Sequence, residues 1–291
     1  MIRSISRAGA SALALGGLAF AVIPPAAAQT DKAPAGFVSL FDGKTLKGWR
    51  GDMTVWSVKD GAIQGGSPTP IPHNTFLVGE KNYANFELRF KYRWLTPEGN
   101  SGMQFRSAQT EGPYAMTGYQ ANVVPTNAPP ERFGMLYNEL GDRQEMALLG
   151  QKATITRRPA GAGGRGRVVR TVSEMVNSRE AIIGSIKPAP EWTEVVVIAY
   201  GNHIVAAING LLAFDAIDND PVRMKDGVFG IQAHSGPAMI VQYKDIYVKP
   251  LTAAPNLAGR FRTNPTPAPE PRQTFKDSTK AAMPDEALPK E

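Results

Sequence analysis

Two stretches of the chain carry polar side chains that suit binding better than simple solvation. Residues 103–106 and 119–123 alternate apolar and polar positions, the period of two that is typical of a strand with one buried face. The polar positions are Gln104, Arg106, Gln120 and Asn122. Amide and guanidinium groups can hold a polyhydroxylated ligand through paired hydrogen bonds. We therefore predict a binding surface, with an ordinary solvated sheet face as the alternative.

Two titratable residues could add proton transfer to such a surface. His234 shares strand parity with Gln232, and histidine titrates near neutral pH without special help. Glu139 lies in a compact group of Tyr, Asn, Glu, Asp and Arg at 137–143, which is more chemistry than a connecting segment needs. The structural alternatives are a strand-end histidine bonded to the backbone and a surface acid paired with Arg143.

The elements that would position these groups are almost all strands. Residues 86–94 alternate between apolar and polar side chains, and residues 195–200 and 203–208 form two further strands around a tight turn. Asn209 and Gly210 supply the strongest two-residue hairpin signal in the chain. About a dozen strands and almost no helical periodicity predict an all-β fold, a two-sheet antiparallel sandwich.

The N-terminus has the pattern of an export signal. Arg3 and Arg7 precede a short apolar run, and three alanines follow at 26–28. This pattern predicts a signal peptide over residues 1–28, because the run is too short and too rich in Ala and Gly to span a membrane comfortably. The chain has no cysteine, which excludes disulfides and a lipid-anchored cysteine. We expect a soluble protein exported to the bacterial periplasm or secreted.

The basic net charge of +6 is concentrated in one loop. Six basic residues and no acidic one lie between Lys152 and Arg170, around the Gly-rich segment 160–166 that we interpret as a mobile loop. The rest of the predicted folded body is slightly acidic, so the composition argues against a nucleic-acid partner. Residues 252–291 are rich in proline and poor in large apolar groups, which predicts a disordered tail.

Several motifs in order resemble one family. They include F-V-S-L-F-D-G-K-T-L-K-G-W near the start, then G-N-S-G-M-Q-F-R-S, and later G-V-F-G-I-Q-A-H-S-G-P. On these motifs the chain is similar to the 3-keto-disaccharide hydrolases over roughly residues 36–251. The resemblance implies a jelly-roll sandwich of the concanavalin A-like type. It also implies cleavage of glycosides whose C3 hydroxyl has been oxidised to a ketone, by hydrolysis or by β-elimination across C1 and C2.

Such a reaction assigns roles to the candidate residues. A C3 ketone acidifies the proton on C2, so cleavage needs a base, a group for the negative oxygen, and an acid or metal for the leaving group. We expect His234 as the first candidate base, Glu139 as the alternative base or a metal ligand, and Arg106 at the negative oxygen. Contacts to the substrate are expected from Gln104, Gln120, Asn122, Tyr137, Asn100, Gln232 and His73.

Departures from the family pattern keep other functions open. Many relatives carry an acid where this chain has Gln120, Asn122 or Asn138, and the missing carboxylates argue against a metal site at these positions. A divalent ion such as Ca²⁺, bound by other residues, is kept as an alternative cofactor. A glycosidase that uses two carboxyl groups is a further possibility, but the sequence contains no E-x-D-x-x-E signature for it. A non-catalytic carbohydrate-binding module would fit the same polar face, and a structural exported protein is the third class. For an enzyme and for a carbohydrate-binding module alike, the expected partner is a carbohydrate. The sequence does not indicate an oligomeric state.

Overall fold

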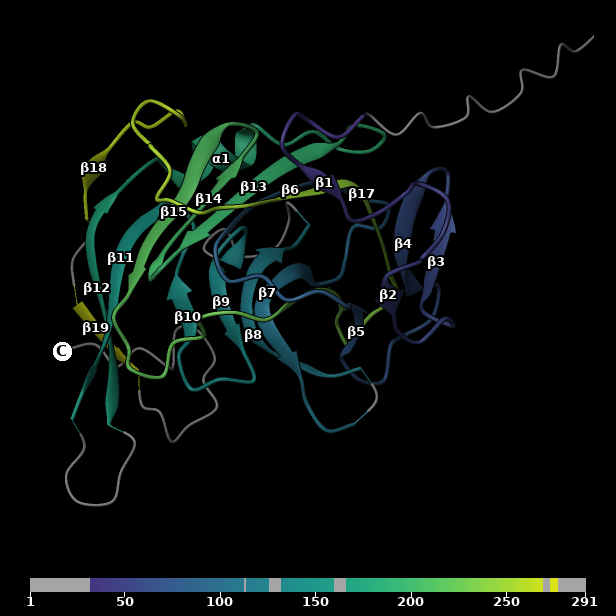
Figure 1. Cartoon of the computed structure of the whole chain (residues 1–291), viewed down its shortest axis with the longest axis horizontal. Helices are drawn as coiled ribbons and strands as arrows, with labels where there is room; N and C mark the ends of the chain where they lie inside the picture. The colour runs from purple at the N-terminus through teal and green to yellow at the C-terminus, as the bar shows by residue number, and fades with distance from the viewer. Residues whose placement is uncertain (1–31, 113, 126–131, 160–165, 269–272, 277–291) are drawn as a thin grey trace, which may run out of the picture.

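A computed structural model describes residues 32–112, 114–125, 132–159, 166–268 and 273–276 (Figure 1). The predicted signal peptide at 1–28 and residues 160–165 of the Gly-rich segment lie outside the described residues. Within the described part, no helix is long and apolar enough to cross a membrane.

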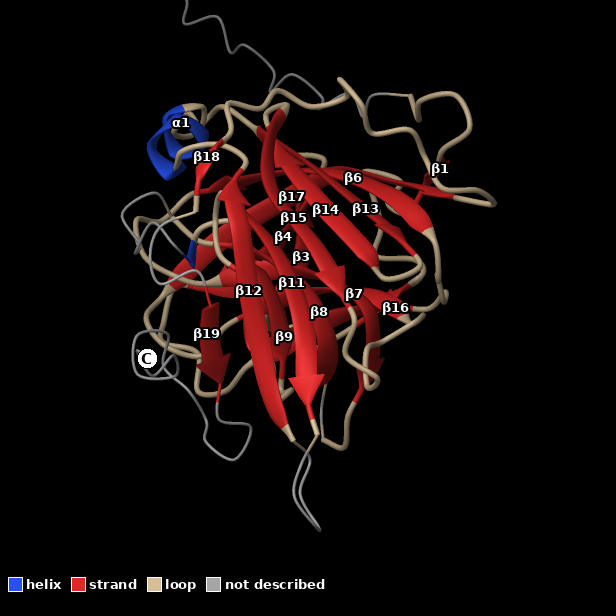
Figure 2. Ribbon diagram, turned by 90° about the vertical axis from the view of Figure 1, so that its left-hand side faces the viewer, coloured by secondary structure: helices blue, strands red, loops and turns tan. Residues whose placement is uncertain are grey.

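The described chain forms two antiparallel sheets that pack on each other, with a single short helix, α1 (Arg179–Gly184), among the described residues (Figure 2). The larger, 12-stranded sheet contains, in spatial order, β18 (Thr266–Pro267), β12 (Arg167–Met175), β11 (Gln151–Arg158), β15 (Leu211–Asp218), β14 (His203–Ile208), β13 (Thr193–Tyr200), β6 (Phe86–Trp94), β17 (Met239–Pro250), β4 (Ala62–Ser67) and β3 (Trp56–Lys59). In addition, β1 (Val38–Ser39) pairs with β17 and β19 (Gln273–Lys276) pairs with β12.

The smaller, 7-stranded sheet carries the predicted binding residues. Its spatial order is β10 (Gln144–Ala147), β9 (Leu136–Glu139), β8 (Met116–Val123), β7 (Ser101–Gln109), β16 (Val228–Ala233), β5 (Thr75–Gly79) and β2 (Trp49–Arg50). Nearly all pairs are antiparallel; the exception is the parallel pairing of β11 with β15. The predicted two-sheet sandwich is thus confirmed.

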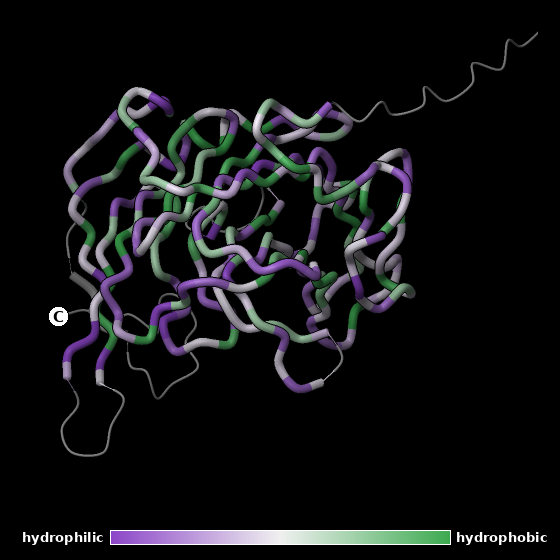
Figure 3. The backbone as a smooth tube through the Cα atoms, viewed as in Figure 1, coloured by the Kyte–Doolittle hydropathy of each residue, from purple (hydrophilic) through white to green (hydrophobic). Residues whose placement is uncertain are grey.

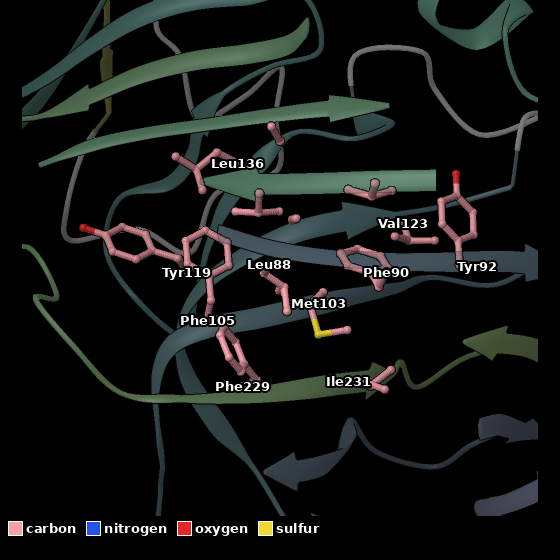
Figure 4. Packing of buried hydrophobic residues seen from close by; sticks show 14 of the residues in the cluster. Leu88, Phe90, Tyr92, Met103, Phe105, Tyr119, Val123, Leu136, Phe229 and Ile231 are labelled. Carbon is pink, nitrogen blue, oxygen red and sulfur yellow. The ribbon is translucent and has the colours of Figure 1, made fainter. Parts of the chain in front are cut away.

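Large apolar side chains fill the space between the sheets. The ring of Phe86 from β6 meets Phe105 and Phe229 of the smaller sheet edge-on, with centroid distances of 5.9 and 4.9 Å. Rings that meet edge to face add to the stability that their burial provides. Met103, Phe105 and Ile231 point into this layer (Figure 4), so Gln104 and Gln232, which have the opposite parity on β7 and β16, lie on the other face of the smaller sheet.

The C-terminal segment does not behave as predicted. A tail disordered from residue 252 is wrong for residues 252–268, which lie along the outer face of the larger sheet (Figure 1). Leu257 and Phe261 pack on the apolar outer side chains of β13, β14 and β15. The N–H of Arg262 donates to the carbonyl of Gly210 at 2.8 Å. The segment contains few apolar residues, which is why its composition predicted disorder. Leu257 and Phe261 are nevertheless enough to cover apolar side chains of the larger sheet that would otherwise face water.

The far end of the β11–β12 hairpin is hydrophilic, as Figure 3 shows. The side chains there include Arg157, which makes ion pairs with Asp142 and Asp220, both with an N–O distance of 2.8 Å. Part of the predicted basic charge is therefore neutralised by acids brought close by the fold.

Candidate functional site

A cavity of about 350 Å³ lies on the face of the smaller sheet that points away from the core. We call it the cleft. Polar residues from four strands, β8, β9, β10 and β16, and from neighbouring loops dominate its lining: Asn74, Asn100, Gln120, Asn122, Arg132, Met135, Tyr137, Glu139, Glu145, Gln232 and His234. A ligand-sized hollow with convergent polar groups is the default expectation for a small-molecule site.

Strand register explains why these residues meet. Across neighbouring strands Glu145 pairs with Tyr137, Tyr137 with Gln120, and Gln120 with Gln104. Residues directly opposite in antiparallel strands point to the same face, so one row of side chains runs across four strands. The polar row predicted from alternation on two strands is therefore present and continues onto β9 and β10.

The amides of the cleft form one hydrogen-bonded chain that ends at a carboxyl group. Gln104 Nε2 donates to Gln120 Oε1 at 2.8 Å, and Gln120 Nε2 donates to Gln232 Oε1 at 3.2 Å. Gln232 Nε2 then donates to Oε2 of Glu139 at 3.2 Å. Because each amide accepts from one neighbour and donates to the next, the chain fixes the orientation of all four side chains.

Glu139 carries a carboxyl group of the cleft whose pKa is displaced toward neutrality. Burial raises its pKa from 4.5 to about 7, and hydrogen bonds from Gln232 and Asn74 partly oppose that rise. A carboxyl group that titrates near neutral pH inside a cavity is a candidate proton acceptor or donor. The alternative of a surface acid paired with Arg143 is wrong, since Glu139 is buried and Arg143 forms its ion pair with Asp218 at 2.5 Å.

His234 also lines the cleft, at the C-terminal end of β16. Its Nδ1 lies 2.6 Å from the carbonyl oxygen of Ser235. Because a carbonyl can only accept, Nδ1 must carry a proton, and in the neutral imidazole Nε2 then has a lone pair. The backbone-bonded histidine that we weighed as an alternative is thus correct for one ring nitrogen, and the other can accept a hydrogen bond.

Arg106 lies away from the cleft, which corrects its predicted role. A β-bulge between Phe105 and Ala108 interrupts the alternation, and Arg106 has a φ of +46°. The side chain consequently turns toward the larger sheet, where it donates to the carbonyls of Ala84 at 2.6 Å and Gly201 at 2.7 Å. Arg106 joins loops rather than binding a ligand. A bulge of this kind leaves no trace in the apolar–polar pattern.

Two further predicted contacts are also displaced. His73 is exposed and does not line the cleft, whereas its neighbour Asn74 does. Gln104 is fully buried behind Gln120 and supports the cleft without lining it. The remaining predicted contacts, Gln120, Asn122, Tyr137, Asn100 and Gln232, line the cleft as expected.

The sequence interpretation missed Asn74, Arg132 and Glu145. Glu145 has no alternation signal, because Q-E-M-A places two polar residues before two apolar ones, and a register shift interrupts β10 between Glu145 and Ala147. Asn74 precedes β5 and Arg132 precedes β9, so both belong to connections whose position depends on tertiary structure. A metal site gains no support: among the described residues, no three His, Asp or Glu side chains are grouped as a metal ion requires. We therefore derive no step through a metal.

Comparison with known proteins identifies a family and a relative that this chain resembles. A family model described as the 3-keto-alpha-glucoside-1,2-lyase-like domain matches residues 36–249. A 3-keto-disaccharide hydrolase of Bacteroides thetaiotaomicron is 23% identical over 240 residues, covering 74% of this chain and 79% of that protein.

Solved structures show more distant likeness. A Parabacteroides distasonis protein provisionally classed as a glycosyl hydrolase has a TM-score of 0.47 and 18% identity, covering 74% of this chain and 94% of its own. A carbohydrate-binding module of Bacillus subtilis has a TM-score of 0.44 and 14% identity, covering 69% and 95%.

Proposed function

Because the chain belongs to the family of 3-keto-alpha-glucoside-1,2-lyase-like domains, we propose that it cleaves 3-keto-glycosides in the cleft. The observation that carries the proposal is the buried carboxyl group of Glu139, whose pKa is raised to about 7 at the end of an oriented amide chain. A carboxylate with a raised pKa is a stronger base than a free one, and it still ionises at neutral pH.

The proposed reaction is an elimination in which Glu139 moves one proton. Its carboxylate removes the C2 proton of the sugar, and the electron pair of that C–H bond forms a C2=C3 bond while the C3 oxygen becomes negative. When the C3 carbonyl re-forms, the C1–O bond breaks and a C1=C2 bond forms. Protonated Glu139 then gives its proton to the departing oxygen, which balances the step without a second acid. Addition of water to the unsaturated sugar would complete a net hydrolysis.

Glu139 is preferred to His234 as the base for two reasons. Amide donors from Gln232 and Asn74 orient its carboxyl group, and its pKa suits both acceptance and release of a proton near neutrality. His234 has its Nδ1–H committed to Ser235, so its Nε2 lone pair is suited to accept a hydrogen bond from a sugar hydroxyl. We assign His234 to substrate positioning.

Release of the aglycone from a chromogenic 3-keto-glucoside tests the proposal. The protein should release it, and should leave the parent glucoside, with its ordinary C3 hydroxyl, intact, because only the ketone acidifies the C2 proton. Sugar binding without release would instead identify a carbohydrate-binding module, a function that the amides at Gln120 and Asn122 in place of acids would suit. Export of the protein, on the pattern of residues 1–28, is a separate part of the proposal.

The rate should depend on pH through Glu139. Only the carboxylate form can accept the C2 proton, so kcat/KM should rise with pH, reach a plateau above an apparent pKa of about 7, and fall about tenfold per unit below it. A pH–rate profile on the 3-keto-glucoside measures this limb. A rate that increases as pH falls below 7 would mean that Glu139 reacts in its protonated form, contrary to the mechanism.

Gly102 should matter to catalysis although it carries no side chain. A Cβ at this position would lie 2.5 Å from Cδ of Gln120, so Gly102→Ala must displace that amide and disturb the chain that orients Glu139. Misplacement by about 1 Å can lower a rate about 100-fold, and we expect kcat to fall between tenfold and 100-fold. Gly184→Ala is the matched control, because a Cβ there meets nothing within 4 Å. Equal rates in both variants would refute the role of the amide chain.

A further inference from the structure

The proposed elimination requires a partner for the oxygen that becomes negative at C3, and Arg106 cannot be that partner from its place in the fold. We propose that Arg132 holds this oxygen and is a catalytic residue of the cleft. The inference rests on the proposed function and extends it by naming the group that stabilises the developing charge.

Arg132 is the one Arg or Lys among the described residues that line the cleft. Within the described part of the chain, its guanidinium makes no hydrogen bond and no ion pair, unlike Arg106 and Arg143, whose guanidinium groups are saturated by carbonyl, amide and carboxyl oxygens. A half-buried guanidinium with unused donors beside a hollow is suited to bind an oxygen of the ligand.

The other donors of the cleft are largely engaged. Gln120 Nε2 donates to both Asn122 Oδ1 and Gln232 Oε1, at 3.0 and 3.2 Å. Gln232 Nε2 donates to Glu139. The amide chain therefore orients the base and has little capacity to stabilise a new negative charge, which leaves that task to the guanidinium.

The positive charge of Arg132 acts on the side chain of Tyr137, which also lines the cleft. Burial raises the pKa of the Tyr137 hydroxyl, Glu145 and Glu139 raise it further, and Arg132 acts in the opposite direction. Arg132 thus exerts its field at a side chain that also feels the charge of both carboxyl groups of the cleft. A charge preorganised at the site where an oxyanion forms is usually the largest single contribution to catalysis.

Asn122 holds Arg132 in position. Its Nδ2 donates to the carbonyl oxygen of Arg132 at 2.9 Å, while its Oδ1 accepts from Gln120. An aspartate at 122 could not donate to that carbonyl, so the amide that departs from the family pattern has a use here. We assign Asn122 as a positioning residue for Arg132, in addition to its place in the lining.

In the step itself, Glu139 takes the C2 proton and the C3 oxygen gains the negative charge against the guanidinium. When the C3 carbonyl re-forms, the electron pair of the C2=C3 bond forms the C1=C2 bond and the C1–O bond breaks. The departing oxygen keeps the pair of the broken bond, and with it the negative charge, and it takes the proton from Glu139. No oxidant, reductant or further reactant is needed. The guanidinium favours the charged intermediate over the neutral ketone, so its contribution should appear in kcat more than in affinity for an uncharged sugar.

Steady-state kinetics of Arg132→Met on the 3-keto-glucoside tests the proposal. We expect kcat to fall about 100- to 1,000-fold, the usual loss when one oxyanion donor is removed, and added guanidinium ion to restore part of it. Affinity for the parent 3-hydroxy glucoside, measured by calorimetry, should change less than threefold. Arg50→Met, at an exposed arginine bonded to Gln109, is the matched control and should retain the wild-type rate.

Asn122→Asp provides the second variant, since it keeps the shape and removes the donor to Arg132. We expect an intermediate loss of kcat that guanidinium ion does not rescue, because the guanidinium of Arg132 is still present. A kcat within threefold of wild type in Arg132→Met, with the wild type active, would overturn this inference alone. An equal loss of kcat and of affinity for the 3-hydroxy glucoside would also overturn it, by showing a binding role. A wild-type protein inactive on 3-keto-glucosides would instead overturn the proposed function.

Discussion

Replacing Glu139 with Gln should abolish cleavage of a 3-keto-glucoside and leave the protein folded. A positioned general base contributes about 100- to 10,000-fold, so kcat should fall by at least 100-fold. The amide keeps the shape of the side chain and can still accept a hydrogen bond from Gln232, so the cleft should be preserved. Steady-state kinetics measures the loss of kcat, and circular dichroism checks that the variant is folded.

The same substitution should change stability in a way that depends on pH. The pKa of Glu139 is about 7 in the folded protein and 4.5 as its ordinary value, so the folded state binds the proton more tightly than the unfolded state. This contribution to stability is fully present below pH 4.5 and is lost as pH rises through 7, by on the order of 3 kcal/mol. Glu139→Gln should therefore exceed the wild type in free energy of unfolding at pH 8 and lose that advantage near pH 4.

Urea unfolding at the two pH values checks this behaviour. Gly184→Ala serves as the control, because it changes no ionising group and a Cβ there meets nothing within 4 Å, so its effect should be the same at both pH values. A Glu139→Gln variant that is less stable than the wild type at pH 8 would mean that the carboxylate is well solvated or paired, and that burial does not raise its pKa.

Arg143→Met should strongly lower the free energy of unfolding, although Arg143 does not line the cleft. Arg143 and Asp218 form a buried ion pair at 2.5 Å, with side chains 2% and 0% exposed. The hydroxyl of Tyr119 also donates to Asp218, at 2.5 Å. Removing the cation leaves a buried carboxylate with its pairing charge gone, which costs about 3–5 kcal/mol. Urea unfolding at pH 7 measures the change.

The double variant Arg143→Met with Asp218→Asn is the control for that interpretation. Neutralising both partners removes the uncompensated charge, so the double variant should recover a large part of the stability lost in the single variant. A single variant that loses less than 1 kcal/mol would show that water or another cation reaches Asp218.

Alternation of side chains was enough to predict the sandwich and most of the cleft. Gln120, Asn122 and Gln232 lie on regular strands, where parity alone decides which face a side chain occupies. The same reasoning failed for Arg106, because a bulge and a positive φ reverse its direction. Such a reversal depends on contacts with loops of the other sheet, which lie far away in the sequence.

The raised pKa of Glu139 could not have been predicted either. Its value depends on burial and on donors from Gln232 and Asn74, and both are properties of the assembled sheet. Arg132 was missed for a related reason, since its place in the lining depends on tertiary contacts such as the hydrogen bond from Asn122 to its carbonyl. Residue types indicated the candidates, and strand register and burial decided among them.

The most direct measurement of the central claim compares a 3-keto-glucoside carrying hydrogen at C2 with one carrying deuterium there. If Glu139 removes this proton, aglycone release should be slower from the deuterated substrate, and the sugar product should have lost its deuterium. Equal rates, with deuterium retained at C2 of the product, would contradict proton abstraction and show that water cleaves the glycosidic bond directly.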